Sequence, residues 1–195
     1  MKKLIIVGGP PACGKTFVAK LISESLKSIV YIDKDDLVEL LHRSFELQGQ
    51  PINMDGEFYA KNLHSVEYNT VIRIAFSALQ YADRVILNAP FIKEARDEDY
   101  MRKLKEKAFS LDAELIFIWV IASPEVCLYR MRKRNLERDY FKLANWNEYI
   151  KTLDFSVPQK LVEKNAVDEL IVFDTTDAAA TANYLKKTLD IIKDR

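Results

Sequence analysis

GGPPACGKT, at residues 8–16, follows directly on the apolar run LIIV at residues 4–7. The stretch fits the phosphate-binding pattern G-x-x-x-x-G-K-S/T, and it holds three of the five glycines in the chain. Glycine allows backbone angles that bring successive N–H groups around an anion with no side chain in the way. The stretch therefore predicts a buried strand, a phosphate-binding loop and a helix that begins near Lys15.

The fixed positions of this pattern each have a chemical task. Gly9 and Gly14 open the backbone toward phosphate, and the helix that follows directs the positive end of its dipole at the same anion. The ammonium of Lys15 can reach the outer phosphates of a nucleotide, and the hydroxyl of Thr16 can ligate magnesium. Cys13 is interpreted either as a small residue that fits the loop or as a thiol whose pKa the helix N-terminus lowers. We expect nucleotide contacts from Gly9, Pro10, Pro11, Ala12, Cys13, Gly14, Lys15, Thr16 and Phe17.

Composition limits the class of protein. A length of 195 residues predicts one domain over residues 1–195, and the balance of 29 basic and 29 acidic residues gives no general attraction to nucleic acid. Two cysteines do not make a disulfide framework. No apolar run reaches the roughly 20 residues of a membrane span, and the first one is too short for a signal peptide. We expect a soluble cytoplasmic protein with no membrane partner, and the composition says nothing about its oligomeric state.

Short apolar runs alternate with longer amphipathic stretches along the chain. Alternation of this kind predicts an α/β fold with a five-stranded parallel sheet and helices on both faces. The expected strands are residues 4–7, 29–32, 84–90, 114–122 and 169–175, and the expected helices are residues 15–27, 36–45, 57–81, 94–111, from 124 onward, and 181–193. Glycines and a proline between residues 45 and 60 mark an insertion at which an acceptor could bind.

An aspartate pair follows the second expected strand, in YIDKDDL at residues 31–37. Ligands of open α/β sheets bind beyond the carboxyl ends of the strands, so Asp33 and Asp35 should lie beside the phosphate loop. Phosphoryl transfer needs one carboxylate near magnesium and another that orients or deprotonates the acceptor hydroxyl. The alternative is that Asp35 or Asp36 only caps the next helix.

An arginine-rich stretch, YRMRKRNLERDYFKLANW, occupies residues 129–146. In a continuous helix Arg130, Arg134 and Arg138 share one face, and stacked guanidinium groups repel each other unless an anion lies between them. This pattern predicts a lid over residues 130–146. The alternative is a solvated helix whose charges are balanced by nearby acidic residues.

These three features in this order resemble the small P-loop kinases. The similarity is to shikimate and gluconate kinases, to chloramphenicol phosphotransferase and most of all to the zeta-toxin and polynucleotide-kinase-like group. The resemblance implies a three-layer P-loop NTPase fold with an arginine-rich lid and transfer of the γ-phosphoryl group of ATP. It also implies catalytic roles for Lys15, Asp35, Arg130, Arg134 and Arg138, magnesium ligation by Thr16 and Asp33, and an adenine contact at Thr175.

Two positions depart from that family pattern. Val38 stands where the zeta-toxin-like group usually has a basic residue, which disfavours an acceptor with its own phosphate near this helix. Asn88 stands where many P-loop proteins have an aspartate that helps to hold magnesium. Asn88 and Phe91 could instead contact the acceptor, or Asn88 could be a turn residue before Pro90.

The leading hypothesis is an ATP-dependent kinase that acts, with Mg²⁺, on a hydroxyl group of a small molecule. One alternative is a kinase of nucleotides, nucleotide sugars or nucleic-acid ends, although the zero net charge disfavours nucleic acid as a partner. The other is a nucleotide-binding regulatory ATPase. The side chains of Tyr59, His64, Glu67 and Tyr68 either line an acceptor pocket or form the core-facing edge of a helix.

Overall fold

The protein forms one parallel sheet flanked by helices. The computed structural model describes residues 1–193 and the side chains of all of these except Glu137 and Arg138. Within this part of the chain the strand order is β2-β3-β1-β4-β5, and every pair of neighbours is parallel. The strands are β1 (Lys2–Gly8), β2 (Ile29–Asp33), β3 (Arg84–Asn88), β4 (Ala113–Ile121) and β5 (Glu169–Asp174). The five-stranded α/β fold predicted from the sequence is confirmed.

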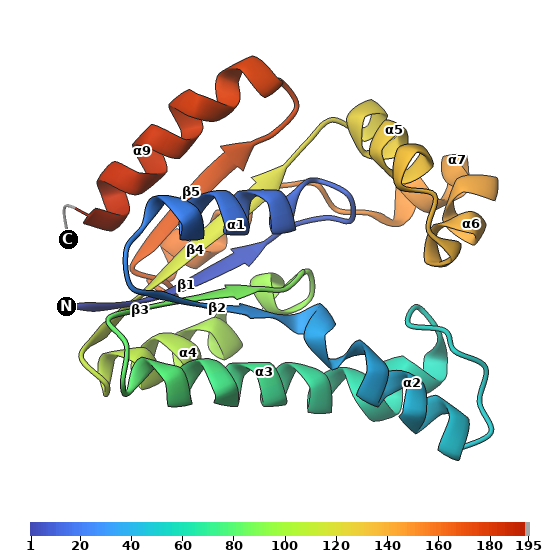
Figure 1. The fold of residues 1–195 in the computed structure, drawn as a ribbon, viewed down its shortest axis with the longest axis horizontal. Coiled ribbons are helices and arrows are strands. Elements are labelled where there is room, and N and C mark those ends of the chain that lie inside the picture. Colours follow the sequence, from blue (N-terminus) through green and yellow to red (C-terminus); the bar gives the residue numbers. More distant parts are fainter. Residues whose placement is uncertain (194–195) are drawn as a thin grey trace.

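Helices cover both faces of this sheet (Figure 1). On one side lie α1 (Lys15–Ser25) and α9 (Thr181–Lys193), and on the other lie α3 (His64–Leu79) and α4 (Glu98–Phe109). Successive residues of β4 alternate between the two cores: Leu115, Phe117 and Trp119 join the α3–α4 side, while Ile116, Ile118 and Val120 join the α1–α9 side. A strand covered on both faces has no polar side, which explains its uninterrupted apolar sequence.

The two long helical stretches expected from the sequence are interrupted in the structure. The stretch at 57–81 begins with a π-helical turn, η2 (Tyr59–Leu63), before α3. The stretch at 94–111 divides into the short helix η3 (Glu94–Arg96) and α4, because the Asp97 side chain accepts a hydrogen bond from the backbone N–H of Tyr100 and starts a new helix there.

The arginine-rich stretch is not one helix. Helix α5 (Pro124–Arg134) ends at Asn135, whose φ of 46° is left-handed, and α6 (Glu137–Ala144) and α7 (Trp146–Tyr149) follow. Asparagine adopts this conformation more readily than most residues do, so it ends the helix. The prediction that Arg130, Arg134 and Arg138 share one helical face is therefore wrong.

The remaining elements are helices that lie along the chain between those already described. They are η1 (Lys34–Leu37), α2 (Val38–Leu47), η4 (Ile150–Thr152), α8 (Lys160–Glu163) and η5 (Ala178–Ala180). In Figure 1, α2 and the group α5–α7 lie at the same end of the molecule, beyond the carboxyl ends of the strands. No helix in the described part of the chain is long and apolar enough to cross a membrane.

Candidate active site

The phosphate-binding loop lies between β1 and α1 and uses backbone angles that side chains disfavour. The φ angles are 142° at Gly9, 60° at Ala12 and 98° at Gly14. A Cβ atom on Gly9 would lie 2.2 Å from the carbonyl oxygen of Val120, so only glycine fits there. These angles confirm the loop predicted from the sequence.

The loop has the features of an anion-binding site. Gly14 precedes α1 and has no side chain to cap it, and the first turn of α1 has no acidic residue. The first N–H groups of the helix are therefore left without a side-chain acceptor, as an incoming phosphate requires. Lys15 Nζ lies across the loop and donates to the carbonyl oxygen of Pro10 at 2.8 Å. The residues present thus fit the phosphates of a nucleotide.

Asn88 joins the loop to the aspartate pair. This residue ends β3 and is buried, and its Nδ2 lies 3.0 Å from Thr16 Oγ1, 2.8 Å from Asp33 Oδ2 and 3.4 Å from the hydroxyl of Tyr31. The structure thereby brings together Thr16 and Asp33, the two predicted magnesium ligands. The sequence left two interpretations of Asn88, contact with an acceptor and a turn before Pro90. Neither interpretation accounts for these hydrogen bonds. Tyr31 was missed in the sequence because a tyrosine in a strand has no distinguishing pattern.

The two aspartates have different surroundings. Asp33 Oδ1 accepts from the backbone N–H of Asp35 at 3.0 Å and caps η1, while its Oδ2 accepts from the Tyr31 hydroxyl at 2.7 Å. Burial, together with the adjacent Asp33, raises the pKa of Tyr31, so this hydroxyl keeps its proton. Asp33, rather than Asp35 or Asp36, is therefore the cap. The Asp35 side chain is 56% exposed and lies 3.7 Å from Lys34 Nζ.

Magnesium would depend on few protein ligands. Among the described side chains, no group of three or more His, Cys, Asp and Glu residues is arranged to hold a metal ion. Thr16 Oγ1 and Asp33 Oδ2 both lie within reach of Asn88 Nδ2, and Asn88 Oδ1 is buried with no hydrogen-bond partner among the described residues. Hydroxyl, carboxylate and amide oxygens suit this ion, which also keeps several waters. The donor set fits a magnesium ion that completes its coordination with phosphate oxygens and water.

Arg130 fastens the phosphate loop to the end of β5. Its Nη1 donates to the carbonyl oxygen of Cys13 at 3.1 Å and to Thr175 Oγ1 at 2.8 Å, and its Nη2 donates to the Thr175 carbonyl oxygen at 2.8 Å. The Thr175 hydroxyl in turn donates to the Cys13 carbonyl oxygen at 2.6 Å. Arg130, which the resemblance implied to be catalytic, and Thr175, for which it implied an adenine contact, thus form one unit with the loop. The guanidinium N–H groups already donate to carbonyl and hydroxyl oxygens, so no bound anion is needed to keep this side chain in place.

Arg134 is paired within the lid region. Its Nε and Nη2 contact both carboxylate oxygens of Asp139, which is fully buried. This fork crosses the break between α5 and α6 and stabilises the angle between them. The side chain of Arg138, the third arginine of the predicted set, lies outside the described residues.

Cys13 is buried inside the loop. Its side chain has no exposed surface, and burial raises the pKa of the thiol despite the positive charge of Lys15. The interpretation of Cys13 as a thiol with lowered pKa is therefore wrong, because desolvation outweighs the helix N-terminus. Cys13 is the small residue that packs under the loop. Burial also raises the pKa of the Cys127 thiol, from 9.0 to about 11.

A buried polar network adjoins Asp35. Lys34 Nζ lies 2.7 Å from Glu67 Oε1, and the Tyr59 hydroxyl donates to Glu67 Oε2. All three residues are buried, and Tyr68 is buried beside them. The helix edge considered in the sequence therefore faces inward, but it carries a carboxylate, that of Glu67, which pairs with Lys34.

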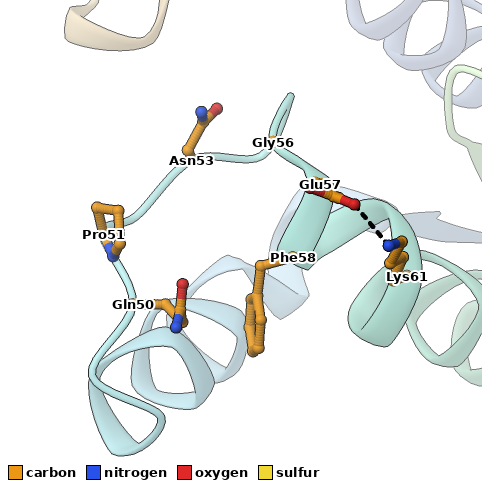
Figure 2. A pocket seen from close by; sticks show the side chains of 7 residues that line it. All are labelled: Gln50, Pro51, Asn53, Gly56, Glu57, Phe58 and Lys61. Carbon is orange, nitrogen blue, oxygen red and sulfur yellow. Dashed lines mark ion pairs between the residues drawn. The ribbon is translucent and has the colours of Figure 1, made fainter.

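The insertion contains a hollow of about 390 Å³, shown in Figure 2. The Glu57 carboxylate and the Lys61 ammonium form an ion pair at its wall (Figure 2). None of the residues predicted to bind nucleotide lines this hollow. Its lining residues are Gln50, Pro51, Asn53, Gly56, Glu57, Phe58 and Lys61.

Fold and site together define a class of protein. A phosphate-binding loop between β1 and α1 of a parallel sheet, with an aspartate pair after β2, is typical of a P-loop NTPase of the kinase type. A family model described as "AAA domain" matches residues 4–155, and the chain belongs to this family.

Solved structures share the fold at low sequence identity. A protein from Chloroflexus aurantiacus J-10-fl that is designated a candidate kinase is 19% identical, with 97% of each chain covered and a TM-score of 0.61. Shikimate kinase from Acinetobacter baumannii, solved with shikimate, is 18% identical over 98% of this chain and 93% of its own, with a TM-score of 0.50. Kti12 from Chaetomium thermophilum, solved with ADP-AlF3, is 17% identical over 96% and 97%, with a TM-score of 0.58. No curated protein matches the chain.

Proposed function

We propose that the protein is an ATP-dependent kinase that transfers the γ-phosphoryl group to a hydroxyl of a small-molecule acceptor. One observation carries this proposal. Asp35 carries an exposed carboxylate, and its backbone N–H donates to Asp33, which Asn88 joins to Thr16 of the phosphate loop. These hydrogen bonds hold the backbone of Asp35 beside the phosphate-binding loop, and phosphoryl transfer to a hydroxyl requires a group there that can accept a proton.

The proposed roles follow from these positions. Lys15 and the N-terminus of α1 bind the phosphates, and Asp35 orients the acceptor hydroxyl and accepts its proton. Thr16 and Asp33 would hold magnesium, which when bound neutralises phosphate charge. Asn88 keeps Thr16 and Asp33 together, a task that its neutral amide performs by donating to both.

The arginine segment has two proposed tasks. Arg130 positions the loop, because its donors are directed at loop carbonyl oxygens and at Thr175. Arg134 and Arg138 belong to a lid over residues 130–146, for which one contact gives support. Lys142 Nζ on α6 lies 2.8 Å from Asp55 Oδ2 in the insertion, so this segment reaches across to the acceptor side.

A panel of hydroxyl-bearing acceptors tests the proposal directly. ADP formation should rise at least tenfold with an acceptor over the rate with water alone, and a phosphorylated product should appear in the same amount as ADP. The Asp35→Asn variant should lose this stimulation. Slow ADP formation that no acceptor stimulates would contradict the proposal.

A nucleotide-binding regulatory ATPase is the second candidate. The similarity in fold to Kti12, which was solved with ADP-AlF3, favours it. Such a protein would hydrolyse ATP without an acceptor, and Asp35→Asn would leave that rate unchanged. The same panel therefore separates the two functions. Nucleotides and nucleic-acid ends belong in the panel, although Val38 and the zero net charge disfavour them.

A further inference from the structure

Lys34 is a buried lysine that stands between the two aspartates of the pair. It is 8% exposed, whereas the side chain of Asp35, the next residue, is 56% exposed. Lys34 belongs to η1, and its Nζ lies 2.7 Å from Glu67 Oε1 and 3.7 Å from Asp35 Oδ1. One ammonium group thus joins a carboxylate inside the protein to the carboxylate that is the proposed proton acceptor.

Glu67 fixes the position of this ammonium group. Its side chain is 1% exposed, and both carboxylate oxygens have partners, because Lys34 donates to Oε1 and the Tyr59 hydroxyl donates to Oε2. Burial and the hydrogen bond to Glu67 raise the pKa of Tyr59, so the hydroxyl keeps the proton that it donates. Glu67 lies on α3 and Tyr59 on η2. The ammonium group is therefore anchored to elements other than the one that carries Asp35.

Stability of the fold does not account for a lysine at this position. Burying two charges costs solvation free energy, and a buried ion pair is often no more stabilising than apolar side chains of the same volume. The surroundings of Lys34 include a further carboxylate, that of Glu94, which lies 3.5 Å from His64. Burial raises the pKa of Glu94, and the charge of Lys34 is one of those that oppose the rise. The positive charge of Lys34 thus acts on the acidic groups around it.

We propose that Lys34 is a positioning residue that holds the Asp35 carboxylate toward the acceptor hydroxyl, with Glu67 as its anchor. At 3.7 Å the attraction is between charges and is not a hydrogen bond, so Lys34 directs the carboxylate without taking the place of the acceptor hydroxyl. The backbone of Asp35 is held separately, since its N–H donates to Asp33 at 3.0 Å. A base that is fixed at both its backbone and its side chain is within reach of the proton before the acceptor arrives. This inference rests on the proposed kinase function for the role of Asp35.

Paired substitutions test the inference without leaving a buried charge unpaired. The site variant combines Lys34→Met with Glu67→Gln and removes both charges. The control variant combines Lys3→Met with Glu114→Gln, which removes another largely buried Lys–Glu pair. That pair lies at the start of β1 and of β4, whereas the phosphate loop follows the end of β1. Thermal unfolding verifies that each variant is folded.

Kinetics use the acceptor of the hydroxyl panel that stimulates ADP formation most. In the site variant kcat should fall about tenfold or more while the KM for ATP stays within about twofold, and the control variant should keep both values. Lys34→Arg, which retains the positive charge, should recover part of the lost kcat. Because Lys34 acts through Asp35, adding the site variant to Asp35→Asn should cost less than about twofold more. A merely structural ion pair would lower the rate in both backgrounds alike.

Crystal structures of the wild type and of the site variant, each with a non-hydrolysable ATP analogue and Mg²⁺, need no acceptor. The Asp35 carboxylate should hold one conformation beside Lys34 in the wild type and should leave it in the site variant. Three results would overturn the inference: an unchanged Asp35 conformation, an unchanged kcat, or an equal loss of kcat in the control variant. The two proposals fail separately. If no acceptor stimulates ADP formation, the kinase function is contradicted, and the crystal structures still decide whether Lys34 holds Asp35.

Discussion

Lys15 is the residue whose charge the proposed reaction uses most directly. Lys15→Met removes the ammonium and leaves the loop glycines and α1 in place, so we expect turnover to fall by about 100-fold or more. Because Lys15 Nζ contacts only the Pro10 carbonyl oxygen among the hydrogen bonds described, the midpoint of thermal unfolding should change little. Steady-state ADP formation and a melting curve measure both. Wild-type turnover in this variant would contradict the assignment of the phosphate loop.

The two aspartates should give different phenotypes. Asp35→Asn keeps the shape of the side chain but cannot accept a proton, so acceptor-dependent turnover should be lost while ATP affinity is kept. Asp33→Asn disturbs the carboxylate that Tyr31, Asn88 and the Asp35 N–H all contact, and it should raise the magnesium concentration needed for half-maximal rate. Magnesium titrations of both variants measure this. If the two variants behave identically, the division of roles is wrong.

We expect Arg130 to stabilise the phosphate loop rather than the charge of the transferred phosphoryl group. Arg130→Ala removes hydrogen bonds to Cys13 and to Thr175, each worth about 1 kcal/mol or more for a charged donor, so unfolding should become easier by about 2 kcal/mol and ATP should bind more weakly. Arg132→Ala, at an exposed position of the same helix, is the control and should have neither effect. Denaturant titration and nucleotide binding measure the two effects. If stability and ATP binding are unchanged and only turnover is lost, the result would instead support direct contact between Arg130 and the phosphoryl group.

Among the elements, α6 and the insertion should respond together to nucleotide. The Lys142–Asp55 contact joins them, and half-exposed ion pairs of this kind typically contribute below 1 kcal/mol. We expect hydrogen exchange over residues 130–146 to slow when a non-hydrolysable ATP analogue binds, since a lid closes over its ligand. Lys142→Met and Asp55→Asn should each weaken this protection, and the double variant should be no worse than either single one. Exchange that is indifferent to nucleotide would contradict the lid.

At the scale of the whole molecule, the buried thiols make the free energy of unfolding depend on pH in the alkaline range. The pKa of Cys127 rises from 9.0, its ordinary value, to about 11 in the folded protein. The unfolded chain therefore releases this proton first, so the stabilising contribution is complete below pH 9 and is lost as pH rises toward 11. The free energy of unfolding should fall over this range in urea titrations, and Cys127→Ala should flatten the fall.

Thiol labelling provides an independent measurement of the same burial. Cys13 and Cys127 are both fully buried, so a thiol reagent should reach either one only when the structure opens. Bound ATP analogue should slow the labelling of Cys13 more than that of Cys127, because it stabilises the loop in which Cys13 lies. Fast labelling of Cys13 in the native protein would contradict the packing described here.

The sequence alone determined the sheet, the phosphate loop and the aspartate pair. These depend on local patterns: apolar runs of strand length, glycines where φ must be positive, and polar residues directly after a strand. The positions of Lys15, Thr16, Asp33 and Asp35 at one edge of the sheet could be predicted for that reason. The helix expected from residue 124 onward is α5, and the Ser123 hydroxyl caps it by accepting from the N–H of Val126.

Only the tertiary structure decided what the other side chains contact. Helical spacing grouped Arg130 and Arg134 with Arg138, but the left-handed Asn135 ends the helix after Arg134. Arg130 joins β5 to the loop, and Arg134 pairs with Asp139. The sequence singled out Asn88 only as a departure from the family pattern, and no pattern marked Glu94. Their surroundings are built by residues distant along the chain, such as Thr16 for Asn88 and His64 for Glu94. Contacts of this kind depend on how strands and helices pack, which local spacing does not encode.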